Sequence, residues 1–206
     1  MWISKLVLNP RSKAVRRDLA NPYEMHRTLS RAVAEALGTQ KERLLWRLEP
    51  TRATEPPVVL VQTLTEPNWG ALETDYYAEV FPPKPFNPHL RPGQTLRFRL
   101  RANPAKRVAR TGKRIALKNP EEKLAWLARR LEEGGFRLLG GENGYRARIL
   151  QDVFLEARKK EALLQVQAVL FEGILEVLDP EKARATLERG VGPGKALGLG
   201  LLSLAP

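Results

Sequence analysis

One short segment constrains the kind of sheet that this chain can build. Residues 96–101 read Leu-Arg-Phe-Arg-Leu-Arg, so apolar and basic side chains alternate without a break. Successive side chains of a β-strand point to opposite faces, so the segment predicts a strand with its apolar residues in a core and its arginines on the other face. We therefore expect a sheet that is covered on one side and cationic on the other.

The alternating segment lies within a longer basic run. From Arg91 to Lys118 the chain has ten basic residues and no acidic one. Most charge runs are solvated surface, but a run of this size without carboxylates is what contacts with phosphates require. Two shorter basic segments, at residues 11–17 and 158–160, accompany it. The candidates for phosphate contact in the long run are Arg97, Arg99, Arg101, Lys106, Arg107, Arg110, Lys113 and Arg114.

Composition excludes several classes of protein. The net charge of +12 favours a polyanionic partner. The chain has no cysteine, which excludes disulfide-stapled domains, thiol catalysis and cysteine-ligated zinc. Hydrophobic residues make up 43% of the chain, which is ordinary for a folded protein and excludes a disordered one. No apolar run is long enough to span a membrane and no secretory signal opens the chain, so we expect a cytoplasmic protein without a membrane partner.

The order of predicted elements indicates an α+β protein with two similar domains. The first half reads strand, helix, strand, strand, helix, strand, which is the ferredoxin-like (RRM-like) βαββαβ plan with an antiparallel sheet. Its expected ranges are 2–8, 22–37, 43–48, 58–63, about 71–79, and 94–101. The second half repeats the plan over 114–117, 121–133, 136–139, a hairpin of 149–157 and 163–177, 179–188, and 199–204. We therefore expect tandem ferredoxin-like domains over 1–102 and 113–206, joined by a basic linker at 103–112.

The helix predicted from residue 22 has a strong start and two different faces. Asn21-Pro22-Tyr23-Glu24 places Asn at the N-cap, Pro at the first helical position and Glu in the capping-box position. Apolar residues recur at helical spacing on one face, which we expect to pack against a core. The opposite face carries a stripe of polar residues at helical spacing: Tyr23, His26, Arg27, Ser30 and Arg31.

The polar stripe has the side chains that acid-base cleavage of RNA requires. His26 can accept or donate a proton near neutral pH, and Tyr23 can bond the attacking hydroxyl or a phosphate oxygen. Arg27 and Arg31 can stabilise charge on the phosphate. The nucleophile would be the 2′-OH of the RNA, so neither a metal nor another cofactor is needed. A lone histidine near a helix start is also often an ordinary surface or capping residue, as we expect for His89.

Other motifs argue against familiar alternatives. The aspartates and glutamates show no spacing typical of a metal-dependent nuclease, so we expect no metal site. The glycine-rich stretch 190–200 has neither the spacing of a Walker loop nor that of a dinucleotide fingerprint. Its glycines instead predict a backbone that another backbone can approach closely. We expect Gly192, Gly194 and Lys195 to contact RNA there.

These features together resemble the CasE family, the endoribonucleases that process CRISPR precursor RNA in type I-E systems. The resemblance rests on residues 21–27 at the start of the first helix, the tandem halves, and the glycine-rich stretch. It implies metal-independent cleavage at the base of a repeat hairpin by 2′-OH attack, giving 2′,3′-cyclic phosphate and 5′-OH ends. It also implies that the product RNA is kept and that the protein joins the other subunits of a surveillance complex.

The resemblance also assigns residues. It implies that Tyr23 and His26 lie at the scissile phosphate and that Arg158, Lys159 and Lys160 lie on a hairpin entering the major groove of the RNA stem. Arg31 stands where the resemblance leads us to expect Lys. The positive charge is kept, but the reach and geometry of the side chain differ. The residues leave open which of Tyr23 and His26 is the base, and they leave two alternatives: a non-catalytic RNA-binding subunit and, more remotely, a basic DNA-binding or ribosome-associated protein.

Overall fold

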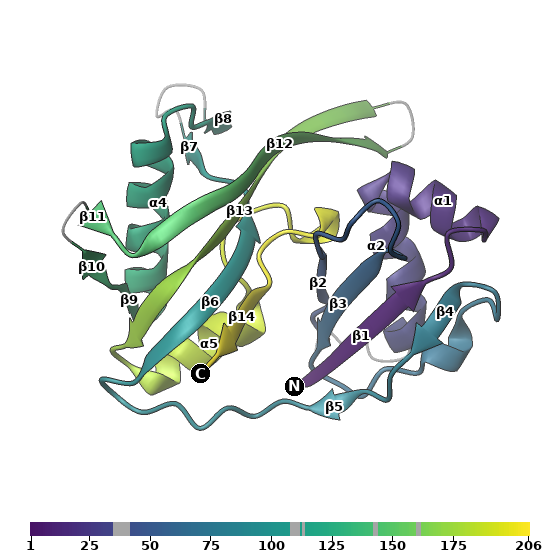
Figure 1. The fold of residues 1–206 in the computed structure, drawn as a ribbon, viewed down its shortest axis with the longest axis horizontal. Helices are drawn as coiled ribbons and strands as arrows, with labels where there is room; N and C mark the ends of the chain where they lie inside the picture. The colour runs from purple at the N-terminus through teal and green to yellow at the C-terminus, as the bar shows by residue number, and fades with distance from the viewer. Residues whose placement is uncertain (35–41, 108–111, 113, 142–143, 160–161) are drawn as a thin grey trace. The chain divides into compact units, whose positions relative to one another are not determined.

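The computed structural model describes residues 1–34, 42–107, 112, 114–141, 144–159 and 162–206 (Figure 1). The chain forms two compact units, each built from segments that are distant in sequence. The first unit comprises Met1–Asn87, Glu156–Leu164 and Lys195–Gly198, and the second comprises Pro88–Leu155, Gln165–Gly194 and Leu199–Pro206. Two short segments from the second half of the sequence therefore belong to the first unit.

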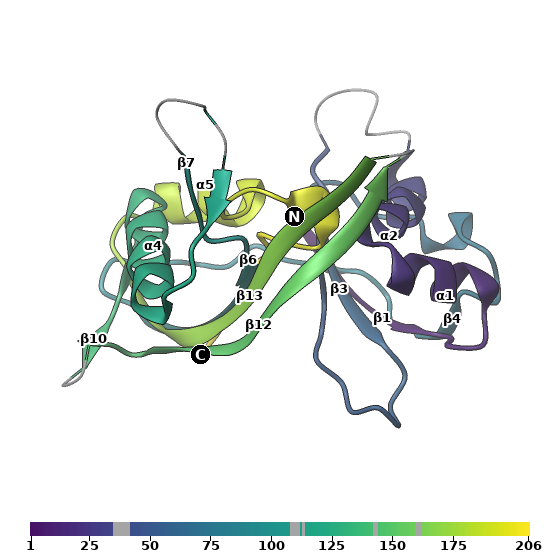
Figure 2. The same ribbon diagram turned by 90° about the horizontal axis from the view of Figure 1, so that it is seen from above.

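The first unit has an antiparallel sheet in the order β2-β3-β1-β4, with β5 also paired to β1. Its strands are β1 (Trp2–Leu8), β2 (Leu45–Leu48), β3 (Val58–Thr63), β4 (Tyr77–Val80) and β5 (Lys84–Pro85). Helices α1 (Lys13–Ala20) and α2 (Pro22–Ser30) lie on one face of this sheet (Figures 1 and 2). The 3-10 turn η1 (Arg31–Val33) follows α2, and the 3-10 turn η2 (Trp69–Ala71) follows β3. Met25 and Leu29 of α2 pack with Leu6, Val59 and Val61 of the sheet in one buried core.

The second unit repeats this arrangement. Its main sheet has the order β12-β13-β6-β14, with β9 paired to β13, and α4 and α5 lie on the same side of it (Figure 2). The elements are β6 (Thr95–Ala102), α4 (Pro120–Glu133), β9 (Phe136–Leu138), β12 (Ala147–Lys159), β13 (Ala162–Val177), α5 (Pro180–Arg189) and β14 (Leu202–Ala205). Two small hairpins, β7 (Ala105–Arg107) with β8 (Arg114–Ala116) and β10 (Gly140–Gly141) with β11 (Gly144–Tyr145), and the 3-10 turn η3 (Lys195–Leu197) complete the described elements.

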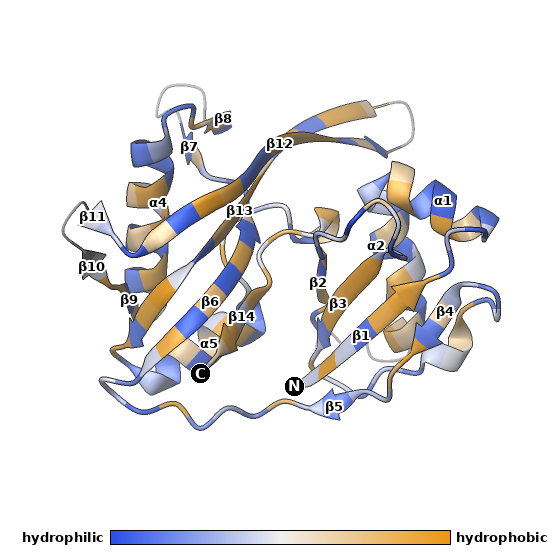
Figure 3. Ribbon diagram, in the orientation of Figure 1, coloured by the Kyte–Doolittle hydropathy of each residue, from blue (hydrophilic) through white to orange (hydrophobic). Residues whose placement is uncertain are grey.

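The two units confirm the tandem ferredoxin-like fold, although β6 belongs to a different sheet from the one expected. Leu96, Phe98 and Leu100 are buried and the arginines between them are more exposed, as the alternation predicts (Figure 3). However, β6 pairs with β13 and β14, so it opens the second βαββαβ plan and does not close the first. An amphipathic pattern shows that a strand has a covered face, but it does not show which sheet covers it.

In the first half, one further expectation was wrong, one holds only in part, and one helix was not predicted. The weak helix expected near 71–79 is replaced by η2 and the edge strand β4, which pairs with β1. The basic segment after β1, for which no element was predicted, forms α1, whose Ala14, Val15 and Asp18 are buried and whose Leu19 packs against the core. The helix expected over 22–37 ends as an α-helix at Ser30 and continues as η1. Residues 35–37 of that expected helix lie outside the described residues.

In the second half, the expected strand at 114–117 is β8, which pairs with β7 in a small hairpin and not in the main sheet. The expected linker, 103–112, carries β7, and the chain leaves the first sheet earlier, after β5. The expected helices and the long hairpin are present, with β12 beginning at Ala147. The boundary expected at residue 102 therefore separates β6 from the elements with which it pairs.

Candidate functional site

The first turn of α2 has the predicted N-cap, but the predicted capping box is replaced by other contacts: the Asn21 N–H donates to the carbonyls of Arg17 and Asp18, and the Glu24 carboxylate pairs with Arg27. Asn21 has an extended backbone and caps the helix, with its Oδ1 accepting a hydrogen bond of 3.2 Å from the backbone N–H of Tyr23. Pro22 occupies the first helical position, where no N–H is needed, and Glu24 places a carboxylate near the positive end of the helix dipole. The start of α2, and with it the placement of Tyr23, is therefore determined by local residues.

The two faces of α2 also agree with the prediction. Met25, Thr28 and Leu29 are buried against the core. On the other face, Tyr23, His26 and Ser30 are half-buried and Arg27 and Arg31 are exposed. Arg31 follows the last α-helical residue and belongs to η1, so it does not continue the regular spacing of the stripe.

His26 has the features of a proton acceptor. Its Nδ1 is buried and has no hydrogen-bond partner among the described residues. Burial lowers the pKa of His26 below the ordinary value of 6.5, because removing water penalises the charged imidazolium. A neutral ring at neutral pH has one nitrogen free to accept a proton. The imidazole is therefore ready to act as a base without first losing a proton.

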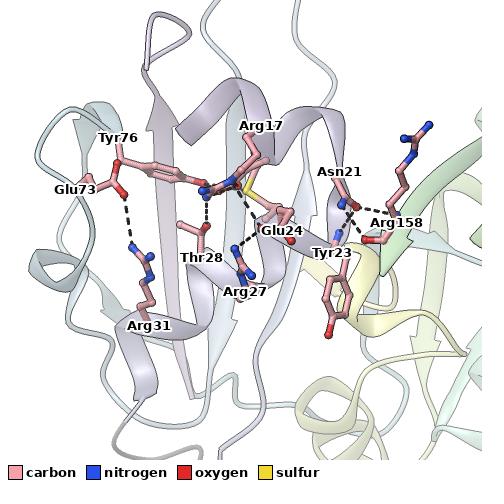
Figure 4. Close-up of polar contacts among 12 residues, drawn as sticks. Arg17, Asn21, Tyr23, Glu24, Arg27, Thr28, Arg31, Glu73, Tyr76 and Arg158 are labelled. Atoms are coloured by element: carbon pink, nitrogen blue, oxygen red, sulfur yellow. Dashed lines mark hydrogen bonds and ion pairs between the residues drawn. The ribbon is translucent and has the colours of Figure 1, made fainter. Parts of the chain in front are cut away.

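A buried polar network beneath α2 holds the helix against α1. Asp18 is 1% exposed and accepts hydrogen bonds of 2.8 Å from Arg17 Nε and from the Tyr76 hydroxyl (Figure 4). Arg17 also donates to Thr28 Oγ1 of α2 at 3.0 Å. Burial and the neighbouring Asp18 carboxylate raise the pKa of Tyr76, so its hydroxyl stays protonated and able to donate. The network supplies the charge balance that a buried carboxylate requires.

Carboxylates balance both arginines of the stripe. Arg27 forms an ion pair of 2.6 Å with Glu24 one turn earlier, and Arg31 lies 3.7 Å from Glu73 (Figure 4). Ser30 donates a hydrogen bond of 2.7 Å to the carbonyl of His26 within the helix. Exposed pairs of this kind are weak, so a phosphate can replace the carboxylate at little cost.

Arg158 of β12 lies at the start of α2 within the first unit. The Asn21 side chain donates from Nδ2 to the Arg158 carbonyl at 3.0 Å and accepts at Oδ1 from the Arg158 N–H at 3.2 Å (Figure 4). The Arg158 side chain is exposed, and Figure 4 shows it pointing away from the Tyr23 hydroxyl. Lys159 is the last residue of β12, and Lys160 lies outside the described residues. No feature of the sequence predicts this contact, because the capping motif explains Asn21 without it.

Part of the glycine-rich stretch also reaches α2. The turn η3 packs against α2, which brings the segment containing Lys195 to the helix in the first unit. Gly198 has a φ of +77°, and a Cβ there would lie 2.7 Å from the Trp46 ring. Only glycine fits that position without strain. Gly192 and Gly194 belong to the second unit, where Gly192 lies against the Trp126 ring. Packing within the protein thus accounts for the form of this loop.

The cationic face of β6 is present, and a carboxylate of the neighbouring strand pairs with Arg99. Arg97 is exposed, and Arg99 and Arg101 are half-buried. Arg99 pairs in register with Glu172 of β13 and forms an ion pair with it. Burial alone would raise the pKa of Glu172, but hydrogen bonds and charge from Arg99 and Arg148 lower it below its ordinary value. The basic run has no carboxylate of its own, and the neighbouring strand supplies one.

The remaining basic candidates divide between described and undescribed positions. Lys106 and Arg107 of β7 and Arg114 of β8 are exposed on one small hairpin of the second unit. Arg110 and Lys113 lie outside the described residues. The described part of the chain holds no group of three or more His, Asp or Glu side chains placed to bind a metal. None of its helices has the length and hydrophobicity that a membrane span requires.

Comparisons with known proteins agree on one family. A family model described as CRISPR associated protein matches residues 1–206. The Thermus thermophilus protein named CRISPR-associated endoribonuclease Cse3 is 73% identical, and the match covers 100% of both chains. The Escherichia coli protein named CRISPR system Cascade subunit CasE is 29% identical, also over 100% of both chains.

The fold is matched by a solved structure of Thermus thermophilus Cse3 bound to an RNA representing a pre-cleavage complex. That chain is 74% identical and superposes with a TM-score of 0.96, covering 100% of this chain and 98% of the other. The similarity therefore extends over both units and all the elements described above.

Proposed function

This chain belongs to the CasE family of CRISPR-associated endoribonucleases, and we propose that the face of α2 carrying Tyr23 and His26 is where it cuts CRISPR precursor RNA. The chain is an endoribonuclease, which decides against a non-catalytic RNA-binding subunit. The observation that carries the assignment of the site is His26, whose Nδ1 is buried and unpaired among the described residues and whose pKa burial lowers.

The proposed reaction uses only groups of the RNA and of the protein. The 2′-oxygen attacks the adjacent phosphorus, the bond from phosphorus to the 5′-oxygen breaks, and a 2′,3′-cyclic phosphate and a 5′-OH result. His26 takes the proton of the 2′-OH, and a proton is returned to the leaving 5′-oxygen. The phenol of Tyr23 hydrogen-bonds a phosphate oxygen or the reacting hydroxyl. Arg27 and Arg31 leave their carboxylates to stabilise the charge that develops on the phosphate.

The RNA-binding residues lie in both units. In the first unit, Arg158, Lys159 and Lys195 come from segments next to α2 and would hold the stem of the repeat hairpin beside the scissile phosphate. In the second unit, the outer face of β6 and the β7–β8 hairpin offer further cations to the backbone. A-form RNA is recognised mainly through its shape and phosphates, which suits arginines on strands and hairpins.

The proposed partners follow from the family. The protein binds the hairpin RNA as precursor and as product, and it joins other subunits of a type I-E complex, as the name of the Escherichia coli relative states for that protein. Its substrate is a cellular transcript, so we propose that it works in the cytoplasm. No metal enters the proposed chemistry, so cleavage should continue in EDTA.

Replacing His26 tests the proposed site. We expect His26→Ala to lower the single-turnover cleavage rate of a cognate hairpin RNA by about 10²–10⁴-fold, the usual contribution of a general acid or base. His89→Ala is the matched control, because His89 is the other histidine and is exposed outside the site. The affinity for RNA should stay within about twofold in both variants. Cleavage by His26→Ala at the wild-type rate would show that the assignment is wrong.

The end chemistry tests the nucleophile separately. A substrate with 2′-deoxyribose on the 5′ side of the scissile phosphate should bind and remain uncut. Rapid cutting of this substrate would exclude attack by the 2′-OH, whatever the role of His26.

A further inference from the structure

Asn21 connects two segments that the proposed function uses for different purposes. Its side-chain oxygen accepts from the N–H of Tyr23 at 3.2 Å and from the N–H of Arg158 at 3.2 Å, and its Nδ2 donates to the Arg158 carbonyl at 3.0 Å. Tyr23 opens the catalytic helix, and Arg158 lies on the hairpin assigned to the RNA stem. One carboxamide therefore bonds to the backbone of both.

The contact with Arg158 has the form of a strand pair. Strand β12 lies at the edge of its sheet, and an edge strand has N–H and C=O groups that no neighbouring strand satisfies. The Asn21 carboxamide carries a donor and an acceptor side by side, as a peptide group does, and it exchanges both bonds with one residue. Asn21 thus fixes the position of β12 at Arg158 through its backbone and leaves the guanidinium available to RNA.

Helix capping explains only part of this arrangement. A cap needs a side-chain oxygen, and Asp or Ser supplies one as well as Asn does. The donor Nδ2 serves no capping purpose, and its bond goes to the hairpin. The orientation of the amide follows from its partners, because the flipped amide would set its NH₂ group against two N–H groups.

We propose that Asn21 is a positioning residue, which holds the stem-binding hairpin in register with Tyr23 so that a bound stem presents its scissile phosphate to the catalytic face of α2. The proposal rests on the function proposed above. Two ordinary hydrogen bonds carry the connection, so its loss should slow cleavage of bound RNA by about tenfold. It should leave the affinity within about twofold, because the RNA-contacting side chains are unchanged.

Two substitutions separate positioning from capping. Asn21→Asp keeps the capping oxygen and places a second oxygen against the Arg158 carbonyl, and Asn21→Ser keeps a cap but is too short to bridge. The serine variant adds no charge, so repulsion of RNA cannot explain a loss common to both. Asn119→Asp and Asn119→Ser are matched controls. Asn119 also precedes a proline, and its Oδ1 accepts from the Glu121 N–H at 2.8 Å to cap α4.

The experiment measures single-turnover cleavage of the hairpin RNA at saturating protein, together with the Kd for RNA and the Tm. We expect both Asn21 variants to be about tenfold slower with a near-unchanged Kd, and both Asn119 variants to cut as wild type does. Wild-type rates in the Asn21 variants would overturn the proposal. So would a loss of Tm and affinity beyond that of the Asn119 variants, because Asn21 would then be only structural. Failure of the wild-type protein to cut would count against the proposed function instead.

Discussion

At the scale of single residues, burial favours the neutral form of His26, the histidine to which we assign the catalytic role. Burial removes water from the imidazole, and the lowered pKa of His26 follows from the cost of a charge there. Arg27, on the same face of the helix, is paired with Glu24. A base that is already neutral is available to every RNA that binds.

The pH dependence of cleavage should report this histidine. At limiting protein concentration, the rate reflects groups of the free enzyme. We expect the rate to be flat at neutral pH and to fall in acid with a midpoint below 6.5, because protonation removes the base and burial delays protonation. Tyr23→Phe should keep this acid limb, and His26→Ala should lose it. A wild-type midpoint above 6.5 would contradict the assigned role of His26.

At the scale of elements, the glycine-rich stretch is shaped by packing. Gly198 combines a positive φ with close contact to Trp46, which is 3% exposed. The same sequence invites comparison with phosphate-binding loops, but two of its glycines, Gly192 and Gly198, lie where a Cβ would meet a tryptophan ring. The proposed contact of Lys195 with RNA depends on this packing, since η3 lies against α2.

Gly198→Ala should destabilise the protein through backbone strain at a positive φ and through crowding of the new Cβ against Trp46. We expect the free energy of unfolding of Gly198→Ala to fall further than that of Gly93→Ala by about 1–3 kcal/mol, the cost of overpacking a core. Gly93 has nearly the same φ, +79° against +77°, but a Cβ there would meet nothing within 4 Å. Urea denaturation of both variants separates crowding from backbone strain. Equal losses would mean that Trp46 moves aside freely.

The sequence predicted most elements because their signals are local. The cap at Asn21, the two faces of α2 and the alternation in β6 each depend on neighbouring residues, and the structure agrees with all three. The sheet that β6 joins, the partner of Arg99 and the bond from Asn21 to Arg158 depend on residues 70 or more positions away. Local periodicity carries no information about such pairings. Helix α1 was missed because it is only eight residues long and four of them are charged, so it was interpreted as a basic segment.

At the scale of the whole molecule, the net charge of +12 overstates what some arginines offer to RNA. Glu172 holds Arg99 and also pairs with Arg148 at 3.4 Å. The carboxylate competes with phosphates for both guanidiniums. If RNA binds at β6 as proposed, its binding includes the cost of breaking these pairs.

Removing that carboxylate should strengthen RNA binding. We expect Glu172→Gln to raise the affinity for RNA several-fold. The slope of log K against the logarithm of the salt concentration should become more negative by up to about one for each arginine released to a phosphate. Glu176→Gln is the matched control: it removes the same charge from the same strand, where the partner is Arg137 at 2.7 Å. Filter binding over a series of salt concentrations gives both slopes. Equal slopes would mean that Arg99 does not meet RNA.

The membership of residues 195–198 in the first unit has a consequence for synthesis on the ribosome. Helix α2 and Trp46 are made early, but the segment that packs on them is translated about 150 residues later. At usual elongation rates of about 5–20 residues per second, that delay is roughly 8 to 30 seconds. A nascent chain in this interval has its catalytic helix without the cover of η3. A premature stop before residue 195 therefore damages the first unit, whose sheet is by then fully translated.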